Sequence, residues 1–110
     1  MKVFAAMDTG TIHKQVYLVE LSGSINGIDL VFLIDSGSNH IFISPKIVKN
    51  LNLFSRNINP ISVEMADGRI VQKTRALVED LGFQIDSFTS MESFHVLNLV
   101  QYDVILRNDL

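Results

Sequence analysis

The sequence contains no cysteine. That absence excludes a disulfide framework, a thiolate zinc site and a cysteine nucleophile, and it is compatible with a reducing compartment. Long apolar runs are also missing, since the longest is far shorter than the roughly 18 residues of a membrane span. The N-terminus lacks the basic and then apolar layout of a signal peptide. We therefore expect a soluble, cytoplasmic protein that does not insert into a membrane.

Clustered positive charge is missing as well. Nine Lys and Arg residues stand against twelve Asp and Glu, which gives a net charge of −3, and the basic residues form no block. Because nucleic acids and anionic membranes bind clustered Lys and Arg, we expect neither as a partner. The three histidines, His13, His40 and His95, have no ligand-like spacing. The sequence therefore predicts no metal site, and we expect no cofactor.

What the chain does have is residue alternation with a period of two. Residues 16–21 alternate in the way typical of a strand with a buried face. Asn26-Gly27 is the residue pair that favours a two-residue type I′ hairpin turn, and the apolar run 28–34 would be the return strand. With 110 residues there is room for one domain with one modest core.

Turn and cap signals divide the rest of the chain. Ser44-Pro45 predicts a short helix that ends near residues 50–52. We expect a loop over 55–60, a hairpin with arms 61–65 and 70–74, and strands over 75–81, 83–88, 93–97 and 103–106. Residues 1–12 have weak patterning and are expected to be a flexible lead-in to a domain over 13–110. The predicted fold class is all-β, a small closed barrel-like lobe with one or two short helices.

The strongest functional signal is Asp35-Ser36-Gly37. An apolar run ends in this carboxylate, and a second apolar run, 41–43, follows the glycine. A buried strand that delivers a carboxylate to a tight turn would orient and partly desolvate it, as acid/base chemistry requires. Asp8-Thr9-Gly10 repeats the tripeptide, but no buried strand pattern surrounds it, and we interpret it as a chance match.

Residues 31–44 resemble the active-site segment of retropepsin-like aspartic proteases, most closely those of gypsy-type retrotransposons and their relatives in plant genomes. Two further blocks occur in the family's order. Met65 to Arg69 is similar to the flap hairpin, and Tyr102 to Leu110 is similar to the closing block. The resemblance covers roughly residues 16–110.

This resemblance implies an aspartic endopeptidase in which each chain supplies one catalytic Asp35. Ser36 would brace the two active-site loops of a homodimer, and Gly37 would allow the turn. Met65, Ala66, Asp67 and Gly68 would form the flap that closes over an extended peptide or polyprotein substrate. No metal takes part in this chemistry, and polyprotein processing is the function it implies.

The chain departs from the family pattern at Arg107, where the family has a glycine. We expect a long charged side chain at that junction to be displaced toward solvent. The helix that normally follows is scarcely begun at Leu110, so the C-terminal end is expected to be truncated. These departures favour an alternative, a catalytically impaired dimerisation or peptide-binding module with the same fold. An unrelated small β-barrel binding domain is a weaker alternative.

Overall fold

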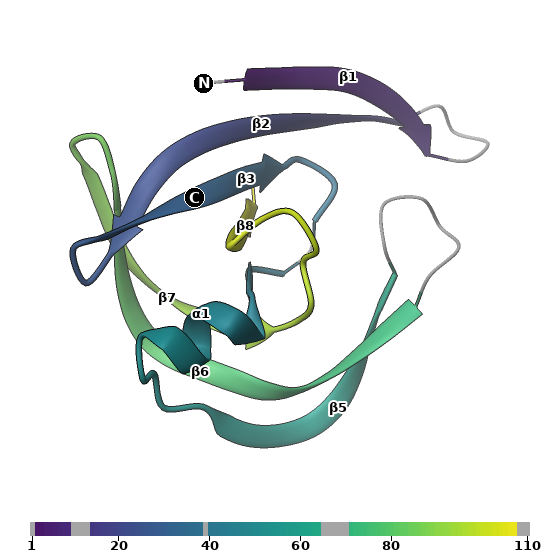
Figure 1. The fold of residues 1–110 in the computed structure, drawn as a ribbon. Helices are drawn as coiled ribbons and strands as arrows, with labels where there is room; N and C mark the ends of the chain where they lie inside the picture. Colours follow the sequence, from purple (N-terminus) through teal and green to yellow (C-terminus); the bar gives the residue numbers. More distant parts are fainter. Residues whose placement is uncertain (1, 10–13, 39, 65–70, 108–110) are drawn as a thin grey trace.

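A computed structural model describes residues 2–9, 14–38, 40–64 and 71–107 of the chain. These residues form one curled β-sheet with a short helix beside it (Figure 1). The elements are β1 (Lys2–Thr9), β2 (Lys14–Ile25), β3 (Ile28–Asp35), β4 (Phe42–Ile43), α1 (Pro45–Asn50), β5 (Arg56–Glu64), β6 (Val71–Ile85), β7 (Phe88–Val96) and β8 (Val104–Arg107). The expected all-β class is confirmed.

The sheet curls until it nearly closes on itself. Its strand order is β1-β2-β3-β8-β4-β7-β6-β5, and a further pairing joins β2 to β6 through Ser24 and Gln84. The β3–β8 and β4–β7 pairs are parallel, and the other neighbours are antiparallel. The short strand β8 therefore lies between β3 and β4, inside the curve of the longer strands (Figure 1).

Two local predictions are confirmed at residue level. Asn26 and Gly27 have φ angles of 52° and 78°, as a type I′ turn between β2 and β3 requires. Helix α1 begins with Pro45 after the N-cap Ser44, whose Oγ accepts a hydrogen bond from the Lys46 N–H at 3.3 Å. Within the described residues, no helix is long and apolar enough to cross a membrane.

The second half of the chain has longer strands than the sequence indicated. β6 runs without a break from Val71 to Ile85, where separate strands over 70–74, 75–81 and 83–88 were expected. β5 takes up most of the predicted loop 55–60. The strand pairing shifts register where extra residues occur. One such shift lies between Val78 and Leu81 in the β6–β7 pairing, where Asp80 has a φ of 53°. A bulge of this kind lets a turn-forming residue sit within a continuous strand.

The structure also differs from the sequence prediction at the N-terminus. Lys2–Thr9, predicted as part of a flexible lead-in, is the strand β1 and pairs antiparallel with β2. Its pairing depends on β2 rather than on any alternation of its own, which is why no local pattern predicted it. Asp8 therefore lies in a strand, and its interpretation as a chance match stays a prediction.

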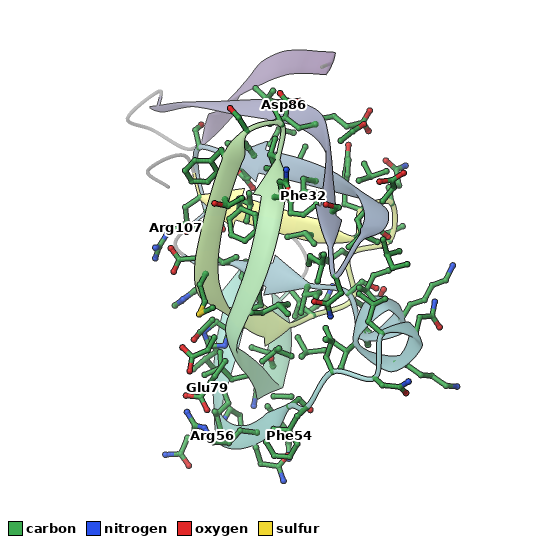
Figure 2. The ribbon with its side chains drawn as sticks, turned by 90° about the vertical axis from the view of Figure 1, so that its left-hand side faces the viewer. Phe32, Phe54, Arg56, Glu79, Asp86 and Arg107 are labelled. Carbon is green, nitrogen blue, oxygen red and sulfur yellow. The ribbon has the colours of Figure 1, made fainter. Side chains whose placement is uncertain are left out.

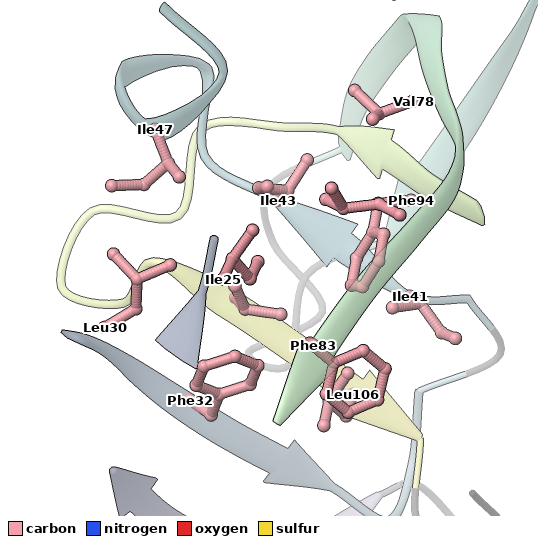
Figure 3. Close-up of a cluster of buried hydrophobic side chains, with 12 residues drawn as sticks. Ile25, Leu30, Phe32, Ile41, Ile43, Ile47, Val78, Phe83, Phe94 and Leu106 are labelled. Carbon is pink, nitrogen blue, oxygen red and sulfur yellow. The ribbon is translucent and has the colours of Figure 1, made fainter. Parts of the chain in front are cut away.

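The core is a large cluster of apolar side chains on the inner face of the curled sheet (Figure 3). The Phe83 ring packs against two other phenylalanines of this cluster, with its centroid 5.8 Å from that of Phe32 and 5.9 Å from that of Phe94. A second apolar cluster contains buried Phe42, Leu97 and Leu99, against which Val63, Tyr102 and Ile105 pack. The first cluster stabilises the lobe, and the second lies toward the candidate site.

Candidate active site

Asp35 is the last residue of β3, and strands on both sides hold its backbone. It is in register with Leu18 of antiparallel β2 and with Arg107 of parallel β8. Its Oδ1 accepts a hydrogen bond from the Gly37 N–H at 2.9 Å, and its carbonyl accepts one from the Ser38 N–H at 3.1 Å. This side-chain-to-backbone turn fixes the orientation of the carboxyl group at the strand end.

Burial changes the acidity of this group. Asp35 is half-buried, and desolvation raises its pKa above the ordinary 3.8, whereas the hydrogen bond from Gly37 acts in the opposite direction. Ser36 beside it is also half-buried, and Gly37 is exposed. The site thus holds a carboxyl group that binds its proton more tightly than a free aspartate does.

The face of the sheet that carries Asp35 also carries apolar side chains. Leu33 lies two residues before Asp35, so both point to the same face, and Leu33 is in register with Ile105. Ile105 packs against the second apolar cluster. Tyr102 of that cluster has its pKa raised by burial and by the nearby Glu20, the register partner of Leu33. Apolar groups therefore lie beside the carboxyl group on one surface.

Asp103 joins β3, the N-cap of α1 and the segment before β8, a role that sequence reasoning missed. Its Oδ2 accepts from the Val31 N–H at 2.7 Å, and its own N–H donates to the Val31 carbonyl at 3.1 Å. The Ser44 N–H donates to the Asp103 carbonyl at 2.9 Å. The signal available in the sequence was a carboxylate placed directly before the apolar run of the last strand.

Arg107 is not displaced toward solvent, and that expectation is wrong. The residue lies at the end of β8 (Figure 2) and is half-buried. It lines an open hollow of about 370 Å³ together with Ile34, Leu106 and Phe88. The aliphatic stem of an arginine can pack along apolar surface while its charged end reaches more polar surroundings. The β8 strand accordingly keeps its pairing with β3 up to this residue.

The predicted flap lies only in part within the described residues. Its arms are confirmed, since β5 and β6 pair antiparallel up to Glu64 and Val71. Met65, Ala66, Asp67 and Gly68, the predicted substrate-binding residues, lie outside the described residues. Their role stays a prediction.

The fold brings two histidines together that the sequence keeps far apart. The rings of His40 and His95 have centroids 5.0 Å apart, and His13 lies outside the described residues. In the described part of the chain, no group of three or more His, Cys, Asp or Glu side chains is placed to hold a metal ion. Spacing along the sequence carried no sign of the pair, because it depends on the pairing of β4 with β7.

Comparison with known families agrees with this site. A family model described as the PEG10/RTL1 protease domain matches residues 31–109, which is more than half of the chain. The matched span begins in β3 and includes Asp35, Ser36 and Gly37 as well as β8. No curated protein matches the chain significantly.

Proposed function

The chain belongs to the PEG10/RTL1 protease domain family, which is retropepsin-like, and on that premise we propose that it is an aspartic endopeptidase that acts as a homodimer. The observation that carries the proposal is the orientation and the raised pKa of the Asp35 carboxyl group. This group is oriented by the Gly37 N–H, and burial raises its pKa. A group with those properties suits acid/base work on a water molecule.

Two such carboxyl groups are needed, and each chain supplies one. Two like charges a few ångströms apart do not both ionise, so a pair of Asp35 side chains across a two-fold axis would share one proton. The ionised member takes a proton from water, whose oxygen attacks the peptide carbonyl carbon. The protonated member donates to the carbonyl oxygen. The roles then exchange as the C–N bond breaks and the amine takes up a proton.

The surroundings of Asp35 support an extended peptide as the substrate. An added peptide strand makes main-chain hydrogen bonds and places alternate side chains in pockets. The second apolar cluster, which lies on the face that carries Asp35, would take apolar side chains of such a strand. Ser36 would brace the two loops across the axis, and Met65 to Gly68 would close over the peptide and exclude water.

A gypsy-type retrotransposon origin, with the parent polyprotein as substrate, is the finer form of this proposal. The family match supports a retrotransposon source but does not distinguish the plant-like branch. Incubation of the purified protease with its inactive parent polyprotein should yield defined fragments at a few sites. Cleavage of unrelated peptides together with an untouched polyprotein would contradict polyprotein processing and leave the protease activity standing.

The alternative is a dimerisation or peptide-binding module that has lost catalysis. Arg107 favours it, because this residue stands beside Asp35 in the β3–β8 register, where the resembling family has a glycine. The complete Asp35-Ser36-Gly37 turn favours the protease, since binding alone does not need an oriented, half-buried acid.

Asp35→Asn separates the two candidates. We expect the wild-type protein to cleave members of a mixed peptide library at mildly acidic pH, as detected by mass spectrometry. Asp35→Asn should abolish cleavage and keep the fold, because an amide cannot exchange the proton. Asp8→Asn is the matched control in the second Asp-Thr/Ser-Gly tripeptide and should cleave like wild type. Peptide binding without cleavage by the wild-type protein would support the alternative.

A further inference from the structure

His40 and His95 form an aromatic pair next to the active-site turn. Their ring centroids are 5.0 Å apart with an interplanar angle of 78°, and the Phe42 ring lies 6.1 Å from His40 and 6.3 Å from His95. The backbone holds both positions. The His95 N–H donates to the Ile41 carbonyl at 2.9 Å, and the Ser38 Oγ donates to the His40 carbonyl at 2.6 Å.

The two rings differ in exposure in a way that suits a ligand. His40 is exposed, whereas the Nδ1 atom of His95 is buried and has no hydrogen-bond partner. A buried polar atom without a partner is costly, and a bound ion is one of the recognised explanations for such an atom. Burial, and then the proximity of His40, lower the pKa of His95, which favours the neutral imidazole that binds metals.

We propose that His40 and His95 together bind a transition-metal ion such as Zn²⁺. Two imidazoles bound to one ion at about 2.1 Å, with a tetrahedral angle between them, have ring centroids about 5 Å apart. The observed separation is 5.0 Å before any ion is added. Rotation of the exposed His40 ring about its second side-chain torsion, which is a soft torsion, can turn a nitrogen toward a shared ion.

Imidazole nitrogens suit zinc, copper and nickel, whereas magnesium and calcium prefer oxygen ligands. No third His, Cys, Asp or Glu of the described residues joins His40 and His95 in a group that could hold an ion. Water would therefore complete the coordination, as in an open rather than a closed structural zinc site. A bound ion would tie residue 40, which follows the Asp35 turn closely, to strand β7. The inference rests on the histidine geometry and not on the proposed protease activity.

Zinc titration of the purified protein tests the site. We expect calorimetry to show one Zn²⁺ per chain, and nitrogen-detected NMR to show shifted ring signals for both His40 and His95. His40→Ala, which removes an exposed ring, should weaken the affinity by at least about tenfold. His95→Phe should do the same, and His13→Gln is the matched control that should bind like wild type. Affinity should fall with decreasing pH, because protons compete for both imidazoles.

Three outcomes would contradict the proposed metal site. They are unshifted His40 and His95 signals at zinc saturation, an affinity that His40→Ala leaves unchanged, and loss of binding in His13→Gln. If His95→Phe fails to fold, the exposed His40 variant still decides the matter. The inactive Asp35→Asn protein should bind Zn²⁺ as wild type does. Loss of binding there would place the ion at the aspartates instead, and it would leave the protease proposal untouched.

Discussion

At the scale of single residues, the chemistry of Asp35 follows from where β3 ends. The strand carries its backbone into a half-buried position, and the Gly37 N–H then orients the carboxyl group. Burial disfavours the charged form, and the single hydrogen bond only partly offsets that effect. The position of Asp35 at the strand end therefore determines both the orientation and the pKa of its carboxyl group.

The raised pKa of Asp35 predicts a pH-dependent cost in stability. A folded-state pKa above the ordinary 3.8 means that the folded chain holds this proton more tightly than the unfolded chain does. This contribution to stability is therefore complete below the ordinary value and is lost as pH rises through the folded pKa. Asn cannot ionise, so Asp35→Asn does not lose this contribution as pH rises. The free energy of unfolding of Asp35→Asn minus that of wild type should therefore increase as pH rises from 3.8 through the folded-state pKa.

Urea unfolding at a series of pH values measures this difference. Asp29→Asn, at an exposed position of the same strand, is the control for removing one carboxylate from the chain. A constant difference between Asp35→Asn and wild type across the window would show that burial does not perturb Asp35.

The placement of Arg107 reverses an expectation from sequence alone. Its half-buried side chain lines the hollow beside Ile34 and Leu106, so Arg107→Gly removes packing and also places a glycine in a strand. We expect the free energy of unfolding to fall by about 1 to 2 kcal/mol. Arg75→Gly, at an exposed strand position of β6, carries the glycine cost without the packing loss and should cost less. A higher melting temperature for Arg107→Gly would contradict the packing role.

At the scale of elements, closure of the sheet depends on the contact between β2 and β6. The two strands meet at Ser24 and Gln84, next to Gly23. A Cβ atom at Gly23 would lie 2.7 Å from the Gln84 carbonyl oxygen and 2.7 Å from the Phe32 ring. Only a residue without a side chain lets the strands approach this closely over the core phenylalanine. The exposed Arg56–Glu79 ion pair, at the far end of the molecule from the Asp86 turn, has no such role (Figure 2).

Gly23→Ala should therefore destabilise the protein through overpacking. We expect a loss of about 1 to 3 kcal/mol in the free energy of unfolding, because both neighbours belong to the packed interior. Gly82→Ala is the matched control in another strand, where the nearest atom to the new Cβ would be the Ser90 carbonyl oxygen at 3.8 Å. Thermal and urea unfolding of both variants measure the effect. Equal changes in the two variants would rule out a special closure role for Gly23.

At the scale of the whole molecule, one lobe carries one Asp35 turn. The proposed chemistry needs two carboxyl groups, so the functional unit would be a symmetric pair of chains with the Asp35 loops at the axis. The second apolar cluster lies on the face that carries Asp35, so each lobe would contribute one half of the peptide site.

Mixing chains tests this arrangement. An equal amount of Asp35→Asn chain is added to a fixed amount of wild type, and the chains are allowed to exchange freely. Total activity should fall to about half, because half of the wild-type chains are then in mixed dimers, which hold only one Asp35 carboxyl group. Adding the same amount of Asp8→Asn chain should instead raise total activity. Activity that is indifferent to added Asp35→Asn, together with sedimentation as a monomer, would contradict the homodimer.

Much of the molecule follows from short-range patterns. Alternation identified β2, the apolar run 28–34 identified β3, and Asn26-Gly27 identified the turn between them. Ser44-Pro45 identified the start of α1. The Asp35 turn could be predicted for the same reason, since strand, acid and glycine are adjacent in the chain. Each of these features depends on the conformational preferences of neighbouring residues, which the sequence alone determines.

The tertiary structure decided what depends on distant partners. It inserted β8 between β3 and β4, which placed Arg107 beside Asp35, and it paired β4 with β7, which brought His40 to His95. Pairing partners, bulges and burial on one face or the other are set by contacts between residues far apart in the chain. A local pattern shows that a strand exists, but its neighbours in the sheet determine which side chains meet.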